Sequence, residues 1–274
     1  MIIDGHVYCL PERLRNPRVK LPASEEVIAN AIYRHAESER ALALSAPAAI
    51  LKSMAVAKID RSVLVAFPWR SAKLCSETNE YLITLAKSDP HFLCIAAVQP
   101  LQRGWQKLAR ACLDNHAIGL KVNPAWQGYG LDSAAMDALC RFAAEHNTFV
   151  MMHVDAAYKK SPASPAALFE LIKRHPRTRI WASHLGGLLG LYHVHAPVKK
   201  LFKNLWFDTA VSATLQFVDF YVQAGLQHKI IFGSDFPFNH SHSQMQVLRG
   251  LQDLRLDLRV NQGILSQNFL RMIA

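Results

Sequence analysis

The sequence predicts a single α/β domain, residues 1–274, in which eight parallel strands close into a (β/α)8 barrel. Short apolar runs recur eight times along the chain, and each is followed by a stretch with helical spacing. The runs are nearly continuous in apolar residues, which is typical of parallel strands buried on both faces. The length of 274 residues also suits one such barrel, which takes about 250 residues.

The expected strands are, in order, residues 2–6, 62–67, 92–98, 118–122, 148–154, 179–184, 204–208 and 229–235. Residues 131–146 place apolar side chains on one helical face, and the pairs Asp132-Ser133 and Ser164-Pro165 are expected helix starts. An open doubly wound sheet is the alternative fold, but no glycine-rich phosphate loop follows the first run.

Residues 11–58 are long for one crossover between two strands. They contain a loop rich in proline and arginine, followed by two segments with helical spacing at about 24–44 and 46–58. We interpret this stretch as a helical insertion, after the first strand, that lies over the mouth of the barrel.

The composition sets limits on the kind of protein. Hydrophobic residues make up 51% and charged residues 19%, which suits a large buried core rather than a disordered or fibrous chain. The net charge of +10 raises the question of nucleic acid, but the basic residues are scattered and no recognition motif occurs. We therefore expect a solvated basic surface that also attracts anionic small molecules, and no binding of nucleic acid.

The cysteines and the apolar segments bear on the cellular location. Five cysteines stand singly, mostly within apolar segments, and no Cys-x-x-Cys occurs, which indicates buried, reduced thiols. No segment reaches the roughly 20 apolar residues of a membrane span. The sequence thus predicts a soluble, cytoplasmic protein that does not bind membranes.

Polar residues gather where the expected strands end, and in such a barrel the active site lies at those ends. They are His6, Tyr8, Lys121, Asn123, His153, Asp155, Ser183, His184, Asp208, Thr209, Ser234 and Asp235. Imidazole and carboxylate groups that converge in a barrel mouth suit an ion such as Zn²⁺. We therefore predict one divalent metal ion near His6, His153 and Asp235.

Five short motifs, in order along the whole chain, resemble the amidohydrolase superfamily, in particular the amidohydrolase-2 group of metal-dependent hydrolases and decarboxylases. The motifs are Ile3-Asp4-Gly5-His6, Gly119-Leu120-Lys121-Val122-Asn123-Pro124, His153 with its neighbours, Ser183-His184-Leu185-Gly186-Gly187, and Phe232-Gly233-Ser234-Asp235-Phe236-Pro237. The segment Ile264 to Leu270 also resembles the closing helix of that group. The resemblance implies one divalent ion, Zn²⁺ first and Mn²⁺ second, and a homodimer.

One position departs from the family pattern. The family opens with His-x-His and both histidines bind metal, whereas here the second position is Tyr8. A phenol with a pKa of about 10 is a poor Zn²⁺ ligand at neutral pH. Three alternatives follow: the metal is held by His6, His153 and Asp235 with water; another residue completes the site; or the chain is a binding protein or a metal-free enzyme. The candidates for completion are Glu12, His193, His195, His240 and His242.

The leading hypothesis for function is hydrolysis of a lactone, an amide or a related small carboxylated compound by a metal-activated water. Asp235 then holds the water and transfers its proton, and His184 stabilises the oxyanion. Asp208 is expected to hold a ligand histidine. The runner-up is a nonoxidative decarboxylase on the same site, and the third reading is a non-catalytic barrel.

Three further residues are expected to contact the substrate: Lys121, Tyr8 and His240. For Lys121 the alternatives stay open, because a strand-four lysine bridges two metals in binuclear relatives after carboxylation. A contact with a substrate anion, a structural ion pair and a lysine that reaches solvent at the rim are the other interpretations.

Overall fold

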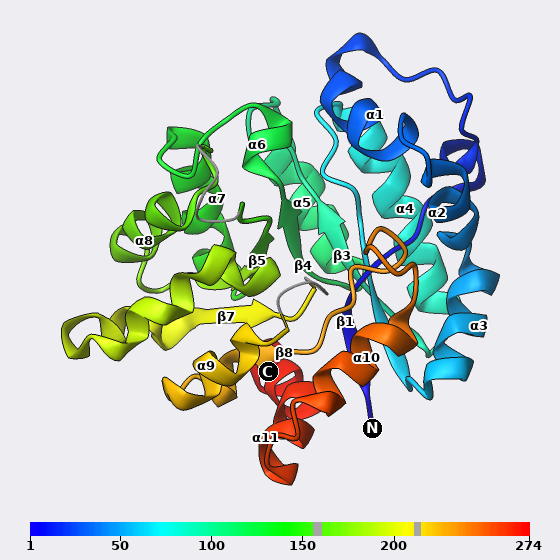
Figure 1. The fold of residues 1–274 in the computed structure, drawn as a ribbon. Coiled ribbons are helices and arrows are strands. Elements are labelled where there is room, and N and C mark those ends of the chain that lie inside the picture. Colours follow the sequence, from blue (N-terminus) through cyan, green and yellow to red (C-terminus); the bar gives the residue numbers. More distant parts are fainter. Residues whose placement is uncertain (156–160, 211–214) are drawn as a thin grey trace.

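The computed structural model describes residues 1–155, 161–210 and 215–274, which form a barrel of eight parallel strands in the order β1 to β8 (Figure 1). The strands are β1 (Ile3–Tyr8), β2 (Arg61–Val65), β3 (Phe92–Ala97), β4 (Ala117–Val122), β5 (Phe149–Met152), β6 (Arg179–Ala182), β7 (Leu205–Asp208) and β8 (Ile230–Ile231). The barrel closes because the Gly5 N–H donates to Phe232 O over 2.8 Å and the Tyr8 N–H to Phe236 O over 2.7 Å. The predicted (β/α)8 barrel is confirmed.

Helices surround the barrel (Figure 1). The α-helices are α1 (Glu26–Tyr33), α2 (Ser38–Leu44), α3 (Pro47–Ala57), α4 (Ala72–Ser88), α5 (Trp105–Asp114), α6 (Pro124–Gln127), α7 (Ala134–Glu145), α8 (Pro165–Arg174), α9 (Phe217–Gln223), α10 (Gln244–Asp253), α11 (Leu258–Gln262) and α12 (Asn268–Ile273). Short 3-10 helices are η1 (Glu12–Arg15), η2 (Ala23–Glu25), η3 (His184–Val194), η4 (Ala196–Asn204) and η6 (Gln227–Lys229), and η7 (Gly263–Gln267) is a π-helix.

Both predicted helix starts are confirmed by their caps. The Ser133 side chain accepts a hydrogen bond from the Met136 N–H, and the Ser164 side chain accepts one from the Ala167 N–H, with proline in the first turn. Within the insertion, the single helix expected over about 24–44 is two helices. The helical conformation is interrupted between α1 and α2, where the His35 N–H donates to Ser38 Oγ over 3.0 Å.

The last strand is shorter than predicted, because two backbone N–H groups beyond Ile231 donate to side chains, although Phe232 O, the Asp235 N–H and Phe236 O still bond the β1 backbone. The Gly233 N–H donates to Thr209 Oγ1 over 3.0 Å, and the Ser234 N–H donates to the Asp4 carboxylate over 2.9 Å. Asp235 then has a φ of +60°. This irregular segment re-aims Asp235 at the barrel mouth, which a continued strand would not do.

The core fills the barrel and the space between strands and helices. Phe149 and Trp181 are fully buried, and a Cβ on Gly119 would lie 2.3 Å from Phe149 Cζ, so only glycine fits there. All five cysteines are free and buried, as predicted. In the described part of the chain no single helix is long and apolar enough to cross a membrane, although α2 and α3 together, bent by 83°, meet the same criteria.

Candidate functional site

His6 on β1 and Asp208 at the end of β7 form the buried centre of the site. His6 Nδ1 donates to Asp208 Oδ2 over 3.0 Å, and neither side chain is exposed. Asp208 also accepts from Trp181 Nε1 at 2.9 Å, from the His184 N–H at 2.7 Å and from the Ala210 N–H at 3.2 Å. Four donors fix the carboxylate, and this fixes the proton of His6 on Nδ1 and the lone pair on Nε2.

The free lone pair of His6 meets Tyr8 and Asp235. Tyr8 Oη lies 3.2 Å from His6 Nε2, and Asp235 Oδ1 lies 3.4 Å from the same nitrogen. Burial, and next the charge of Asp235, raises the pKa of Tyr8 well above its usual 10. The tyrosine therefore remains a neutral phenol, and its O–H donates to His6 Nε2.

His184 and His153 form a second pair on the side of β5 and β6. His184 Nδ1 lies 3.0 Å from the Ala210 carbonyl, so it carries a proton, and Nε2 accepts from His153 Nδ1 over 2.9 Å. His153 Nε2 faces Asp155 Oδ1 at 3.3 Å. Both ring nitrogens of His153 are thus engaged.

The motif of residues 183–187 orients His184. Residues from His184 to Leu188 have φ between +52° and +74°, a left-handed turn that brings the His184 N–H to Asp208. Gly187 is needed in this turn, since a Cβ there would lie 2.3 Å from the Asp155 carbonyl oxygen. The two glycines of the motif therefore allow the turn that orients His184, and they are not a phosphate-binding loop.

Lys121 on β4 is a fully buried cation beside this cluster. Its Nζ donates to Ser183 Oγ over 3.3 Å, and the side chain is 0% exposed. Burial lowers the pKa of Lys121 to about 8, against the opposing charges of Asp208 and Asp235. Burial, and next the charge of Lys121, lowers the pKa of His6 to about 4, so His6 is a neutral imidazole.

Two carboxyl groups of the cluster differ in ionisation. Burial raises the pKa of Asp235 well above its usual 3.8, and Lys121 opposes this only in part. Burial acts on Asp208 in the same direction, but the electrostatic interactions with the His6 and His184 rings and the hydrogen bonds to Asp208 outweigh it and hold its pKa below its usual range. The site thus holds one firm carboxylate and one carboxyl group that takes a proton readily.

A cavity of about 220 Å³ opens above the cluster. Its lining comes from strand ends and from the insertion: Tyr8, Ala31, Ile32, His35, Ala41, Phe67, Asn123, Trp126, His153, His184, Asp235, Phe238 and His242. Tyr8, Phe67 and Phe238 form an aromatic cluster with ring centroids 4.5–5.7 Å apart. The contribution of α1 and α2 agrees with an insertion over the mouth. Lys121 is not among the lining residues and lies behind them.

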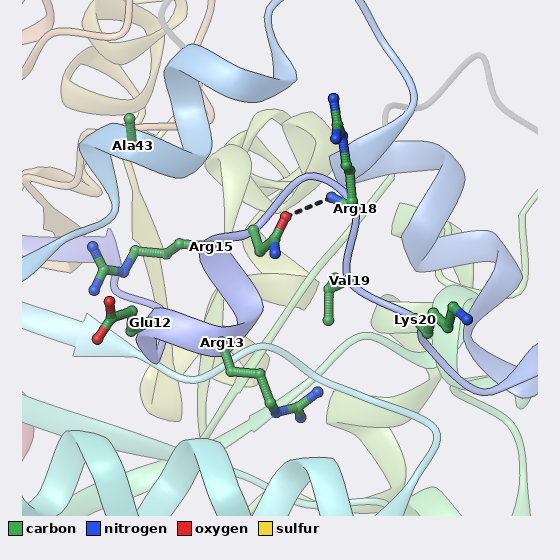
Figure 2. Close-up of a pocket in the computed structure, with 8 residues that line it drawn as sticks. Glu12, Arg13, Arg15, Arg18, Val19, Lys20 and Ala43 are labelled. Atoms are coloured by element: carbon green, nitrogen blue, oxygen red, sulfur yellow. Dashed lines mark hydrogen bonds between the residues drawn. The ribbon is translucent and has the colours of Figure 1, made fainter.

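The remaining residues named from sequence lie elsewhere. His193 Nδ1 donates to the Ala224 carbonyl over 2.8 Å, and His195 and His240 are exposed and do not line the cavity. Glu12 lines a separate open groove of about 720 Å³ together with Arg13, Arg15, Arg18 and Lys20 (Figure 2). Of the proposed replacements for the second histidine, only His242 lines the cavity.

Sequence patterns did not indicate which residues of the insertion line the cavity. Ala31, Ile32 and His35 lie on or just after α1, and Phe238 lies after β8. Their spacing is that of ordinary surface and core positions, since only the path of the chain over the mouth brings them to the cavity. Among these lining residues, His35 is the one whose side-chain chemistry could have marked it as a site candidate.

A bound divalent ion would need three donor side chains to turn toward one point. Among residues 1–155, 161–210 and 215–274, no group of three or more His, Cys, Asp or Glu is arranged to hold a metal ion. His6 Nε2 and Asp235 Oδ1 approach each other, but the nitrogens of His153 face His184 and Asp155. The side chains in this arrangement do not fit the predicted site, so the ligand set His6, His153 and Asp235 stays a prediction.

Comparisons with known proteins agree with the fold. A family model described as amidohydrolase matches residues 3–273. The 5-carboxyvanillate decarboxylase of Sphingomonas paucimobilis has a similar structure, with a TM-score of 0.80 at 11% identity, covering 99% of this chain and 98% of that one. No curated protein sequence matches the chain.

Two further structures are similar over nearly their whole length. The 5-carboxyvanillate decarboxylase of Novosphingobium aromaticivorans, complexed with manganese and 4-hydroxy-3-methoxy-5-nitrobenzoic acid, has a TM-score of 0.79 at 14% identity, covering 100% of this chain and 96% of that one. The 2,6-dihydroxybenzoate decarboxylase of Rhizobium has a TM-score of 0.73 at 16% identity, with 99% and 98% covered. At these identities the likeness shows the fold.

Proposed function

Because the chain belongs to the amidohydrolase family, we propose that it catalyses nonoxidative decarboxylation of a small planar carboxylate. The observation that carries the proposal is the cavity of about 220 Å³, which has aromatic walls and a carboxyl group, Asp235, at its inner end. Three of the similar structures are decarboxylases of aromatic acids, which favours this reaction over the hydrolysis that the sequence favoured.

The reaction needs few groups from the protein. The bond between the substrate carbon and its carboxylate breaks, the electron pair stays on that carbon, and CO2 leaves. A proton then forms the new C–H bond. Asp235 is the group that we assign to deliver this proton, because it lines the cavity and also lies 3.4 Å from His6 Nε2.

The cavity walls select the substrate. Tyr8, Phe67 and Phe238 offer ring faces and edges to a planar molecule, and Trp126 is stacked beside His153 with centroids 6.2 Å apart. The volume holds a single substituted ring and little more. The anionic charge of the substrate is favoured by Lys121 behind the lining and by the net charge of +10.

Release of CO2 tests the proposal. We expect purified protein, assayed with and without added Mn²⁺, to release CO2 from at least one member of a panel of hydroxylated benzoates and unsaturated carboxylates. Asp235→Asn is expected to lower kcat by about 100-fold or more, since the proton donor is lost. Asp253→Asn, an exposed change on α10, is the control and leaves kcat unchanged. Hydrolysis of lactones or amides without CO2 release from any carboxylate would overturn the proposal.

A further inference from the structure

Lys121 is a buried cation that the barrel fold by itself does not require. It lies on β4 and is 0% exposed, and its Nζ donates to a neutral serine hydroxyl at 3.3 Å. An ammonium held out of water is costly unless nearby negative charge stabilises it. The firm carboxylate Asp208 supplies negative charge here, and Asp235 adds to it when it is ionised, since both act on Lys121.

The same two aspartates contact the two ring nitrogens of His6, whose Nε2 is the atom that would bind a metal first. His6 Nε2 lies 3.4 Å from Asp235 Oδ1, and Asp208 Oδ2 accepts a hydrogen bond from the other ring nitrogen, Nδ1, over 3.0 Å. A divalent ion at His6 and Asp235 would therefore share the Asp235 carboxylate with the Lys121 ammonium. The ion and the ammonium would together bring three positive charges beside Asp208 and Asp235, which carry at most two negative charges, in a site without exposed surface at His6 or Lys121.

Two other features act in the same direction. The Tyr8 O–H donates into the lone pair of His6 Nε2, which is the electron pair that a metal would need. His153 turns its nitrogens to His184 and Asp155 instead of to His6. Three separate features therefore disfavour a divalent ion: the Tyr8 proton, the orientation of His153 and the buried ammonium of Lys121.

We infer that the Lys121 ammonium supplies the positive charge of this site in place of a divalent ion, and that the chain carries out its reaction without bound metal. This inference rests on the proposed function for the reaction but not for the metal content. The ammonium stabilises the negative charge that develops on the substrate when its carboxylate leaves, and the field acts from behind the cavity lining.

Metal binding tests the inference without any substrate. Protein purified without chelator, incubated with excess Mn²⁺ or Zn²⁺ and desalted, is expected to hold well under one equivalent of metal at this site. Excess Mn²⁺ is expected to leave the melting temperature unchanged, because an ion that binds the folded state would raise it. One tightly held equivalent in the wild type that is lost in His6→Ala overturns the inference.

A pair of substitutions tests the cause. Tyr8→His with Lys121→Met restores a second histidine and removes the ammonium, and we expect this variant to bind one equivalent of Mn²⁺ and to melt at a higher temperature when Mn²⁺ is present. The exposed change Lys107→Met on α5 is the matched control and gains no binding. A folded double variant that still binds no Mn²⁺ contradicts the claim that these two side chains exclude the ion.

Activity separates the inference from the proposed function. We expect chelator-treated wild type to keep its rate of CO2 release, Lys121→Met to lose about 100-fold or more, and Lys121→Arg to keep part of the rate. If CO2 release requires Mn²⁺, the inference fails and the proposed function stands. If no carboxylate is decarboxylated with or without metal, the proposed function fails, and metal content still decides whether the site excludes an ion.

Discussion

Two buried aspartates of this barrel accept the same number of hydrogen bonds, but their pKa values are shifted in opposite directions. Asp4 on β1 accepts from the His6 N–H, from the Ser234 N–H and Oγ, and from Gln244 Nε2. Asp208 also accepts four hydrogen bonds. Yet burial raises the pKa of Asp4 from 3.8 to about 6, despite its donors, whereas the pKa of Asp208 lies below its usual range.

The difference lies in the charge of the surroundings rather than in the number of bonds. The donors to Asp4 are a serine, a glutamine and two backbone amides, all neutral. Asp208 has the His6 ring and the His184 N–H as donors and interacts electrostatically with both histidines, which lowers its pKa, and it also acts on the Lys121 ammonium. Asp4 therefore joins β1 to the segment after β8 and to α10 as a structural group, while Asp208 is the fixed negative charge of the site.

The largest expected effect comes from Asp208→Asn. The amide would turn an N–H₂ group toward two of the four donors, so we expect the free energy of unfolding to fall by about 3–5 kcal/mol. His6 would lose the partner that fixes its tautomer, so CO2 release is expected to fall by about 100-fold or more. Urea unfolding at neutral pH and the rate of the folded fraction measure both.

The pH dependence of the stability difference between wild type and Asp208→Asn tests the direction of the pKa shift of Asp208. Because the folded-state pKa of Asp208 is lowered, its stabilisation is present above about pH 4 and is lost only as the pH falls further. The wild type should therefore keep its full advantage over the variant between pH 5 and 8. An advantage that disappears across that range would contradict the role of Asp208 as a firm carboxylate.

The second effect concerns Asp4 and has the opposite sign. Its folded pKa is raised to about 6, so its favourable contribution is complete below about pH 4 and is lost as the pH rises through 6. Two pKa units correspond to about 3 kcal/mol, so the advantage of wild type over Asp4→Asn should shrink by about that amount from pH 4 to pH 7. Urea unfolding at both pH values measures it.

The control for Asp4→Asn is Asp253→Asn, an exposed change for which the difference from wild type should not vary over the same range. An advantage of the wild type over Asp4→Asn that stays constant or grows with pH would mean that the two buried aspartates do not differ as their surroundings indicate.

The smallest effect is expected from Gln244→Met on α10. The change removes one of four donors to Asp4 and a longer hydrogen bond of 3.3 Å to Ser62 Oγ, and it also removes Gln244 Oε1, which has no hydrogen-bond partner in the described structure. Loss of these hydrogen bonds and loss of an unsatisfied acceptor oppose each other, so the free energy of unfolding should change by less than about 1 kcal/mol. A change of several kcal/mol would show that a single donor matters more than the net charge around the carboxylate.

Much of the fold could be predicted, because strands that are buried on both faces of a sheet appear in the sequence as continuous apolar runs. Seven of the eight strands lie close to the expected apolar runs, and the caps Ser133 and Ser164 mark their helices. The run at 229–235 failed as a strand after Ile231, since hydrogen bonds from Gly233 and Ser234 go to side chains. Periodicity does not record which partner a backbone amide finds.

For the site, the sequence by itself determined which residue types stand at the strand ends: His6, His153, His184, Asp208 and Asp235 all lie around one mouth or just beneath it. Only the tertiary structure decided how their atoms face each other. The Tyr8 proton points at His6, His153 turns to His184, and Lys121 is withdrawn behind the cavity. The physical reason is that a strand fixes the position of a Cβ atom, whereas the ring orientation, the tautomer and the shared charge depend on partners that are distant along the chain.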